Sequence, residues 1–172
     1  MTTFLDGQPD GAGRRFAVAV AEFNGDVTGA LLDGCLATLR AHGVDDDRIT
    51  VARVPGAFEL PLCCQALAAS GRYAAVIALG AVIRGETPHF EHVAGGCREG
   101  LMRVMLDQRL PVVFGVLTTD TLDQARRRAD PALLTGADAG SRERSEKTAP
   151  RSNKGAEAAL VALRMADLLS RI

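Results

Sequence analysis

The sequence predicts an α/β protein whose parallel sheet is covered by helices on both faces. Three observations support this prediction. Short β-prone runs alternate with stretches in which apolar residues recur at helical spacing. The connections between them are short, and strands joined by crossover helices are parallel, with right-handed crossovers. The run PVVFGVL at 111–117 is apolar throughout, as expected for a strand covered on both faces.

The predicted elements follow this alternation along the chain. Turn formers such as EFNGD at 22–26 end the apolar runs and place loops after the strands. Strands are predicted at 15–21, 49–54, 73–79 and 111–117. Helices are predicted from Val27 to the stop at 42–43, from the segment 54–61 to 70–71, at about 91–108, at 118–129 with an N-cap at Thr119 or Asp120, and at 153–172.

Length and composition indicate one domain. The chain has 172 residues, 47% of them apolar and 24% charged, which is enough for one core and too little for two. Residues 1–13 are polar and glycine-rich, so we expect a flexible tail unless another segment holds it. Residues 14–172 form the predicted domain, and its closing helix is apolar on most of its circumference. That helix indicates an oligomer, although a helix buried deep in a monomer would read the same way.

Charge, hydropathy and cysteine spacing exclude several classes of function. A formal net charge of −1 gives no basic surplus for nucleic-acid binding. No apolar run is long enough for a membrane span and the first residues do not resemble a secretory signal, so we expect no membrane association and a cytoplasmic location. The four cysteines lack metal-ligand or C-x-x-C spacing, which favours buried free thiols over disulfides or a metal site.

Three loops at the carboxyl ends of the strands carry unusual residues. Phe23 and Asn24 follow the first strand, where an aromatic ring either stacks on a heterocyclic ligand or packs on the helix start. Gly56, Ala57 and Glu59 follow the second strand. They suit a polyol chain, but Glu59 is equally explained as a carboxylate in the first turn of a helix.

The stretch GAVIRGETPHFE at 80–91 is the most informative of the three. Gly85 permits close backbone approach, Thr87 brings a hydroxyl and Arg84 a cation, all near a helix start that favours anions, so phosphate is the expected guest. His89 can exchange a proton near neutral pH and is a candidate acid–base group, although a structural histidine remains the alternative.

Together these segments resemble the lumazine synthase family of riboflavin biosynthesis. The resemblance runs in order from about Arg15 to the C-terminus. It rests on Phe23-Asn24 and on the motifs VPGAFELP at 54–61, GAVIRGETPHFE at 80–91, PVVFGVLTTDT at 111–121 and NKGAEAA at 153–159. It implies a three-layer, flavodoxin-like fold with strand order 2-1-3-4, and sites between neighbouring subunits of a pentamer.

The resemblance also implies a reaction and a set of site residues. Members condense 5-amino-6-(D-ribitylamino)uracil with 3,4-dihydroxy-2-butanone 4-phosphate, releasing phosphate and water, without a metal or organic cofactor. His89 would shuttle protons. The pyrimidine would contact Phe23, Asn24, Lys154 and the backbone of Ala81, Val82 and Ile83. The ribityl chain would contact Gly56, Ala57 and Glu59. The phosphate would contact Gly85, the backbone of Glu86, Thr87 and Arg128, and Phe114 would come from the adjacent subunit.

One departure from the family concerns residues 130–152. Arg128 is normally followed closely by Asn-Lys-Gly, but here a polar, glycine-rich insertion of about 130–152 separates it from Lys154. Arg126 and Arg127 are therefore alternatives to Arg128 at the phosphate. The insertion also resembles the hinge that governs how pentamers join into shells, so we expect a free pentamer or a pentamer pair.

Two other functions stay open from the sequence. The pocket could hold product-like or flavin ligands without turnover if the insertion displaced Arg128 or Lys154. The second alternative function is a flavodoxin-like module that binds a nucleotide or a flavin phosphate. The usual motifs of such modules are missing, because the chain has neither G-x-x-x-x-G-K-[ST] nor G-x-G-x-x-G after a strand.

Overall fold

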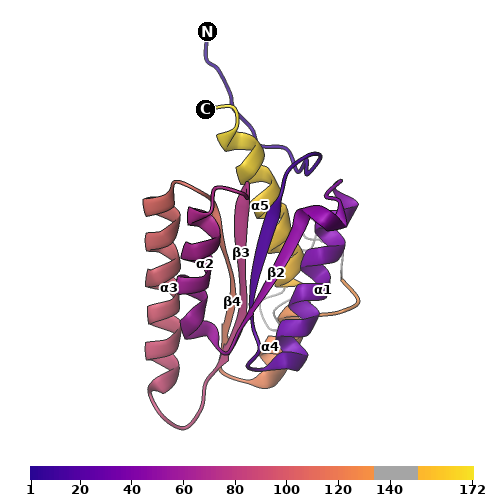
Figure 1. Cartoon of the computed structure of the whole chain (residues 1–172). Helices are drawn as coiled ribbons and strands as arrows, with labels where there is room; N and C mark the ends of the chain where they lie inside the picture. The colour runs from indigo at the N-terminus through magenta and orange to yellow at the C-terminus, as the bar shows by residue number, and fades with distance from the viewer. Residues whose placement is uncertain (134–150) are drawn as a thin grey trace.

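The computed structural model describes residues 1–133 and 151–172 and shows three layers around a parallel sheet (Figure 1). The strand order is β2-β1-β3-β4, and every pairing is parallel. The strands are β1 Phe16–Ala21, β2 Ile49–Val54, β3 Ala75–Ile83 and β4 Val112–Thr119; the helices are α1 Gly25–Ala41, α2 Leu60–Ala69, α3 His89–Gln108, α4 Leu122–Arg128 and α5 Lys154–Leu169, with single 3-10 turns at Asp46–Arg48 and Ala57–Glu59. The predicted flavodoxin-like α/β fold is confirmed.

Alternate residues of β1 face the two helical layers. Phe16, Val18 and Val20 are buried in one cluster with residues of α1 and α5, whereas Ala17, Ala19 and Ala21 are buried in a second cluster with residues of α2 and α3. All six side chains are buried because the strand lies in the middle of a sheet covered on both sides. The strand thus turns its alanines toward α2 and α3 and its larger side chains toward α1 and α5.

Several boundaries differ from the predicted ones, and two of the differences affect the site. β3 continues to Ile83, because pairing with β4 extends through Ile83 and Thr119, so the first residues of the 80–91 stretch belong to the strand. Helix α3 begins at His89 rather than near residue 91. The N-cap of α4 is Thr121, not Thr119 or Asp120: its hydroxyl accepts from the Gln124 N–H at 3.2 Å, and the Gln124 side chain accepts from the Thr121 N–H.

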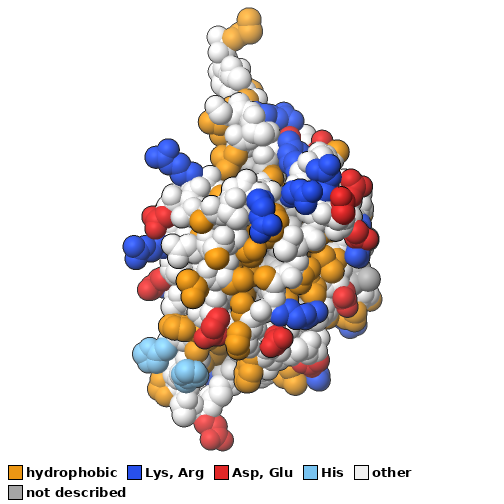
Figure 2. Space-filling model, viewed as in Figure 1, with side chains coloured by type: hydrophobic (Ala, Val, Ile, Leu, Met, Phe, Trp, Pro, Cys, Tyr) orange, Lys and Arg blue, Asp and Glu red, His pale blue; other side chains and the backbone are white. Residues whose placement is uncertain are grey.

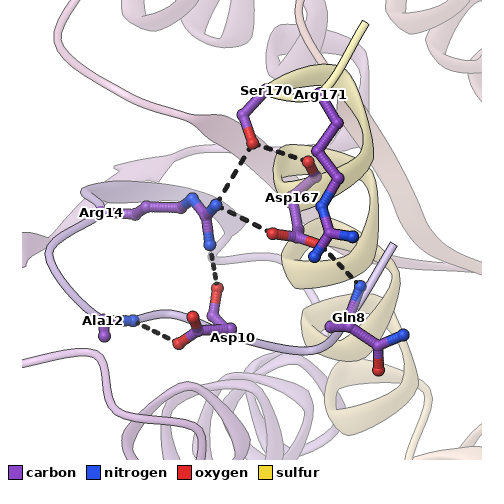
Figure 3. Close-up of polar contacts among 7 residues, drawn as sticks. All are labelled: Gln8, Asp10, Ala12, Arg14, Asp167, Ser170 and Arg171. Carbon is purple, nitrogen blue, oxygen red and sulfur yellow. Dashed lines mark hydrogen bonds and ion pairs between the residues drawn. The ribbon is translucent and has the colours of Figure 1, made fainter. Parts of the chain in front are cut away.

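The N-terminal segment contacts the end of α5 (Figure 3). The Gln8 N–H donates to the buried carboxylate of Asp167 at 2.8 Å, and the Arg14 guanidinium donates to the other carboxylate oxygen at 3.0 Å. Arg171 forms a further ion pair with Asp167 at 2.9 Å. The hydrogen bond from Gln8, with help from the two arginines, lowers the pKa of Asp167. Part of the segment expected to be a tail is therefore tied to the C-terminal helix.

The two chain ends lie at the edge of the sheet where the strands begin, and the loops that follow the strands lie at the opposite edge (Figure 1). Within the described residues, no helix combines the length and apolarity needed to cross a membrane. The site is therefore sought at the carboxyl edge, where ligands of open α/β sheets bind.

Candidate active site at the carboxyl edge of the sheet

The loops after β1, β2 and β3 surround a cavity of about 590 Å³. Two main-chain hydrogen bonds hold the first two loops side by side, from the Glu22 N–H to the Val54 carbonyl at 2.8 Å and from the Phe23 N–H to the Pro55 carbonyl at 3.1 Å. Ten of the predicted site residues line this cavity: Phe23, Gly56, Ala57, Glu59, Ala81, Val82, Ile83, Gly85, Thr87 and His89. Three loops that are distant in sequence thus meet in one place.

Aromatic and histidine side chains make one side of this cavity. Phe23 is 70% exposed, so its ring is available to a flat ligand rather than used to pack the helix start. His89 is the first residue of α3 and is exposed at the cavity. Figure 2 shows histidines on the surface at the same end of the molecule as the β3–α3 loop. Four lining residues were not predicted: Phe58, Phe90, His92 and Val93.

The unpredicted lining residues adjoin the predicted ones in sequence. Phe58 lies inside VPGAFELP and packs on α3, because a side chain added at Gly96 would lie 2.6 Å from its ring. Phe90, His92 and Val93 occupy the first turn of α3, directly after His89. His92 and Val93 lie three and four positions after His89 and therefore share its helix face, a signal that the sequence offered; no such spacing indicated Phe90.

Asn24 does not line the cavity but organises it. Its backbone is left-handed, with φ of 58°, and its carbonyl accepts from the Val27 and Thr28 N–H groups at the start of α1. Its side-chain amide donates to the Ala81 carbonyl at 2.9 Å. Asparagine tolerates this backbone conformation better than most residues, and its amide ties the first loop to the end of β3.

Arg84 faces away from this cavity, unlike the sequence interpretation that placed its charge beside Gly85 and Thr87. Its Nε donates to Asp120 Oδ1 at 2.7 Å, and it lines a separate cavity of about 690 Å³ with Phe90, Glu91 and Asp120. The hydrogen bond that Arg84 donates to the Asp120 carboxylate raises the pKa of Arg84. Glu86 is exposed and also lies outside the lining of the first cavity.

The remaining three predicted residues line a different cavity of about 430 Å³ along β4. Phe114, Arg128 and Lys154 belong to β4, α4 and α5, and they share this cavity with Glu157 and Val161 among others. The Lys154 ammonium pairs with Glu157 Oε2 at 2.5 Å. No residue lines both this cavity and the one at Phe23. One chain therefore carries the predicted site residues in two separate groups.

The three consecutive arginines of α4 have different environments. Arg126 pairs with Asp26 at 3.0 Å and Arg127 with Asp123 at 2.9 Å, and both line another cavity with Arg151. The hydrogen bond from Arg126 lowers the pKa of Asp26. Arg128 forms no ion pair with residues 1–133 or 151–172 and faces the cavity of Lys154. The geometry thus separates Arg128 from its two neighbours.

Main-chain hydrogen bonds bring Arg128 next to Lys154 across the insertion. The Asp130 N–H donates to the Ser152 carbonyl at 3.0 Å, the Ser152 N–H donates to the Arg127 carbonyl at 2.9 Å, and Ala129 pairs with Asn153. The two ends of the insertion therefore close against each other. Its interior, residues 134–150, lies outside the described residues.

The NKG motif at 153–155 has a structural part and an exposed part. The buried Asn153 side chain caps α5 by accepting from the Gly155 and Ala156 N–H groups, and its amide donates to the Ala30 carbonyl at 3.0 Å. A side chain at Gly155 would lie 1.8 Å from the Leu31 carbonyl oxygen, so α5 and α1 touch there. Both residues fix where Lys154 enters its cavity.

The fold and these sites define a flavodoxin-like α/β protein with a ligand site at the carboxyl edge of its sheet. The model of the 6,7-dimethyl-8-ribityllumazine synthase family matches residues 13–170. A 6,7-dimethyl-8-ribityllumazine synthase of Salinibacter ruber is 47% identical over 172 residues, which cover all of this chain and 99% of the relative. The chain belongs to the 6,7-dimethyl-8-ribityllumazine synthase family, whose members are enzymes of riboflavin biosynthesis.

Proposed function

We propose that this chain condenses 5-amino-6-(D-ribitylamino)uracil with 3,4-dihydroxy-2-butanone 4-phosphate to give 6,7-dimethyl-8-ribityllumazine. The observation that carries this proposal is the cavity at the carboxyl edge, where an exposed aromatic ring, a Gly-rich backbone and an imidazole meet in about 590 Å³. It offers a stacking face, hydrogen-bonding backbone and an acid–base group, which are the chemical needs of this reaction. Family membership supports the same substrates.

The first cavity would hold the pyrimidine and the ribityl chain. The ring stacks on Phe23, and its polar edge meets the backbone of Ala81, Val82 and Ile83 at the end of β3. The ribityl hydroxyls reach Gly56, Ala57 and Glu59 after β2. Asn24 acts through its bond to the Ala81 carbonyl, which fixes the backbone that reads the pyrimidine.

The phosphate would lie at the β3–α3 loop. Gly85, Glu86 and Thr87 form no hydrogen bonds with the described residues, so their N–H groups and the Thr87 hydroxyl are free for a ligand. The start of the long helix α3 adds the favourable field of its N-terminus. A guanidinium is the remaining requirement for a firmly held phosphate, and Arg128 of the second cavity supplies it in this proposal.

Each site would be shared by two copies of the chain. Phe114, Arg128 and Lys154 lie in a cavity separate from the one lined by Phe23 and His89, so one copy would place its β4 edge over the first cavity of its neighbour. Exposed apolar side chains occur on both surfaces, with Phe23 and Phe58 on one and Phe114 and Val161 on the other. Burying them against each other stabilises the assembly.

The chemistry then follows from proton transfers within this shared site. The uracil amine attacks the ketone, and loss of a first water gives an imine. Removal of a proton from the butanone carbon chain expels the phosphate, and ring closure with loss of a second water gives the lumazine. None of these steps needs a protein nucleophile, so orientation of two substrates supplies much of the rate, up to about 7–11 kcal/mol in favourable cases. His89, exposed at the cavity, moves the protons.

Phosphate release tests the reaction. Purified protein is mixed with both substrates beside an enzyme-free control, and phosphate and lumazine are followed together. We expect both products to appear at equal rates well above the control. A folded, oligomeric protein that gives no rate above the control would refute the proposed reaction and favour a protein that binds such ligands without turnover. The binding-only alternative would require the insertion to displace Arg128 or Lys154, whereas both residues line one cavity.

Mixed assemblies test whether sites are shared. His89→Ala and Arg128→Ala chains are prepared separately and then reassembled together in equal amounts. If His89 and Arg128 of one site come from different copies, about a quarter of the sites in random mixtures regain both groups and activity rises above either parent. If both groups come from the same copy, the mixture stays as inactive as its parents.

A cytoplasmic location is proposed with this function, since the four cysteines are all free thiols, as in reducing compartments.

A further inference from the structure

Arg84 lies in the chain between Ile83 and Gly85, which both line the Phe23 cavity, but does not line that cavity itself. Its main-chain N–H donates to the Thr119 carbonyl at 2.9 Å, which continues the pairing of β3 with β4. Its side chain lines the cavity at Glu91 and Asp120 rather than the Phe23 cavity and is 46% exposed. Arg84 therefore joins a substrate loop through its backbone and contacts other elements through its guanidinium.

The guanidinium contacts two segments that flank the loop. Its Nε pairs with Asp120 in the turn between β4 and α4 at 2.7 Å, and a terminal nitrogen lies 3.6 Å from Glu91 in the first turn of α3. Its central carbon lies 4.5 Å from the centre of the Phe90 ring. A planar guanidinium can serve a carboxylate and an aromatic face at the same time, which an ammonium cannot do equally well.

The loop between these anchors is not held by hydrogen bonds of its own among the described residues. Gly85, Glu86 and Thr87 donate and accept no hydrogen bonds there, and the next bond is the capping contact from the Glu91 N–H to the Pro88 carbonyl. The conformation of the loop is therefore set at its two ends. Arg84 fixes the first end and contacts the helix turn that forms the second.

Asp120 extends the same network to α4. Its N–H donates to Gln124 Oε1 at 2.8 Å, and that side chain also accepts from the Thr121 N–H in the capping box of α4. Helix α4 ends at Arg128. One arginine thus connects the β3–α3 loop with the start of the helix that carries the proposed phosphate arginine.

We propose that Arg84 is a positioning residue, which holds the Gly85–Thr87 loop in its phosphate-binding conformation without touching the substrate. The inference rests on the proposed function, because it assigns phosphate to that loop. Preorganisation of a loop improves binding by reducing the ordering needed when the ligand arrives. Exposed ion pairs add little to folding stability, so the effect appears in phosphate binding rather than in the melting temperature.

Kinetics of Arg84 variants test this role. We expect Arg84→Ala to raise KM for the butanone phosphate about tenfold through loop misplacement, with KM for the aminouracil and the melting temperature nearly unchanged. Arg84→Lys keeps the charge but loses the planar fork, so it restores only part of the loss. Asp120→Ala weakens the same step, and adding it to Arg84→Ala costs little more because the two residues act together.

Arg40 provides the matched control. Its Nε pairs with Asp46 Oδ1 at the same 2.7 Å, both side chains are exposed, and the pair lies at the end of α1 and the turn before β2, away from the site. Arg40→Ala should leave both KM values unchanged. The positioning role is overturned if Arg84→Ala leaves KM for the butanone phosphate within about twofold, or raises both KM values equally with a drop in melting temperature.

Binding of inorganic phosphate separates this inference from the proposed reaction. Calorimetric titration of phosphate into wild-type protein and Arg84→Ala measures the loop without any turnover. A Kd about tenfold weaker in Arg84→Ala supports the inference even if the wild-type protein releases no product, in which case only the reaction is wrong. Equal Kd values in the two proteins overturn the inference whatever the activity.

Discussion

Arg128 differs from the two arginines before it by its surroundings rather than by its residue type. Arg126 and Arg127 pair with aspartates, whereas Arg128 faces the cavity that holds Lys154 and Phe114. A charge-assisted hydrogen bond to phosphate is worth roughly 1.5–3 kcal/mol. Arg128→Ala should therefore lower kcat/KM for the butanone phosphate by about one to two orders of magnitude.

Arg127→Ala is the control for this prediction, since it removes a neighbouring charge that pairs with Asp123. Steady-state kinetics with the butanone phosphate varied should show kcat/KM of Arg127→Ala close to wild type. If Arg127→Ala and Arg128→Ala lose the same amount, the net charge of α4 matters and the assignment of Arg128 is wrong.

His89 is expected to affect turnover more than binding. It lies at the cavity as the first residue of α3, and a general acid–base contributes about 10²-fold to such proton transfers. His89→Ala should lower kcat by about that factor. His92→Ala tests the neighbouring imidazole of the same cavity and should cost less. Stopped-flow detection of lumazine measures both, and full activity in His89→Ala would remove the proton-transfer role.

The contact between α1 and α5 is the element-scale feature that places Lys154. A methyl group at residue 155 would lie 1.8 Å from the Leu31 carbonyl oxygen, and the α5 backbone must shift to accept it. Gly155→Ala should destabilise the protein by about 1–3 kcal/mol, toward the upper end because the obstacle is backbone. Unfolding in denaturant at fixed protein concentration measures this change.

Gly29→Ala in α1 is the matched control. A side chain at Gly29 meets nothing within 4 Å, so this substitution adds helix propensity without a clash. We expect a gain of about 0.5–1 kcal/mol in the free energy of unfolding. Equal effects of Gly29→Ala and Gly155→Ala would mean that the α1–α5 contact does not restrict residue 155.

Asp167 links the two ends of the molecule, as Figure 3 shows. The Gln8 N–H and two arginines lower its pKa below that of an ordinary aspartate. A lowered pKa in the folded state adds stability above the unfolded pKa of about 3.9, and this stability is lost as the pH falls through the folded pKa. Asp167→Asn should thus lower the melting temperature at pH 7, with a smaller difference from wild type below about pH 4.

Asp33→Asn is the control for this pH dependence, because Asp33 is exposed and has no ion pair among the described residues. Its melting temperature should follow wild type at both pH values. A difference between wild type and Asp167→Asn that stays constant from pH 7 to pH 3 would show that the loss comes from packing rather than from the charge.

Assembly is the prediction for the whole molecule. We expect a pentamer or a pair of pentamers, because the sequence at about 130–152 is an insertion in the segment that resembles the family's hinge between pentamers. Native mass spectrometry should show a mass about five or ten times 18.1 kDa. A sixty-subunit particle in solution would contradict this prediction.

Local sequence determined much of this protein. Alternating apolar runs and short connections sufficed for the fold class, because the period of the apolar residues and the connection length restrict parallel α/β topologies strongly. The strand order 2-1-3-4 followed only from the motifs that resemble the family. The loop motifs at 54–61 and 80–91 sufficed for the first cavity, because loops after parallel strands meet at one edge.

Tertiary structure alone decided the rest. Arg84 turned toward Asp120 and Asn24 toward Ala81, because their partners come from segments about 36 and 57 positions away, which no local pattern reports. The same holds for the pairing of Asp130 with Ser152, which returns Arg128 to Lys154 across the insertion. Sequence spacing measures distance along the chain, whereas charge pairing and backbone hydrogen bonds depend on distance in space.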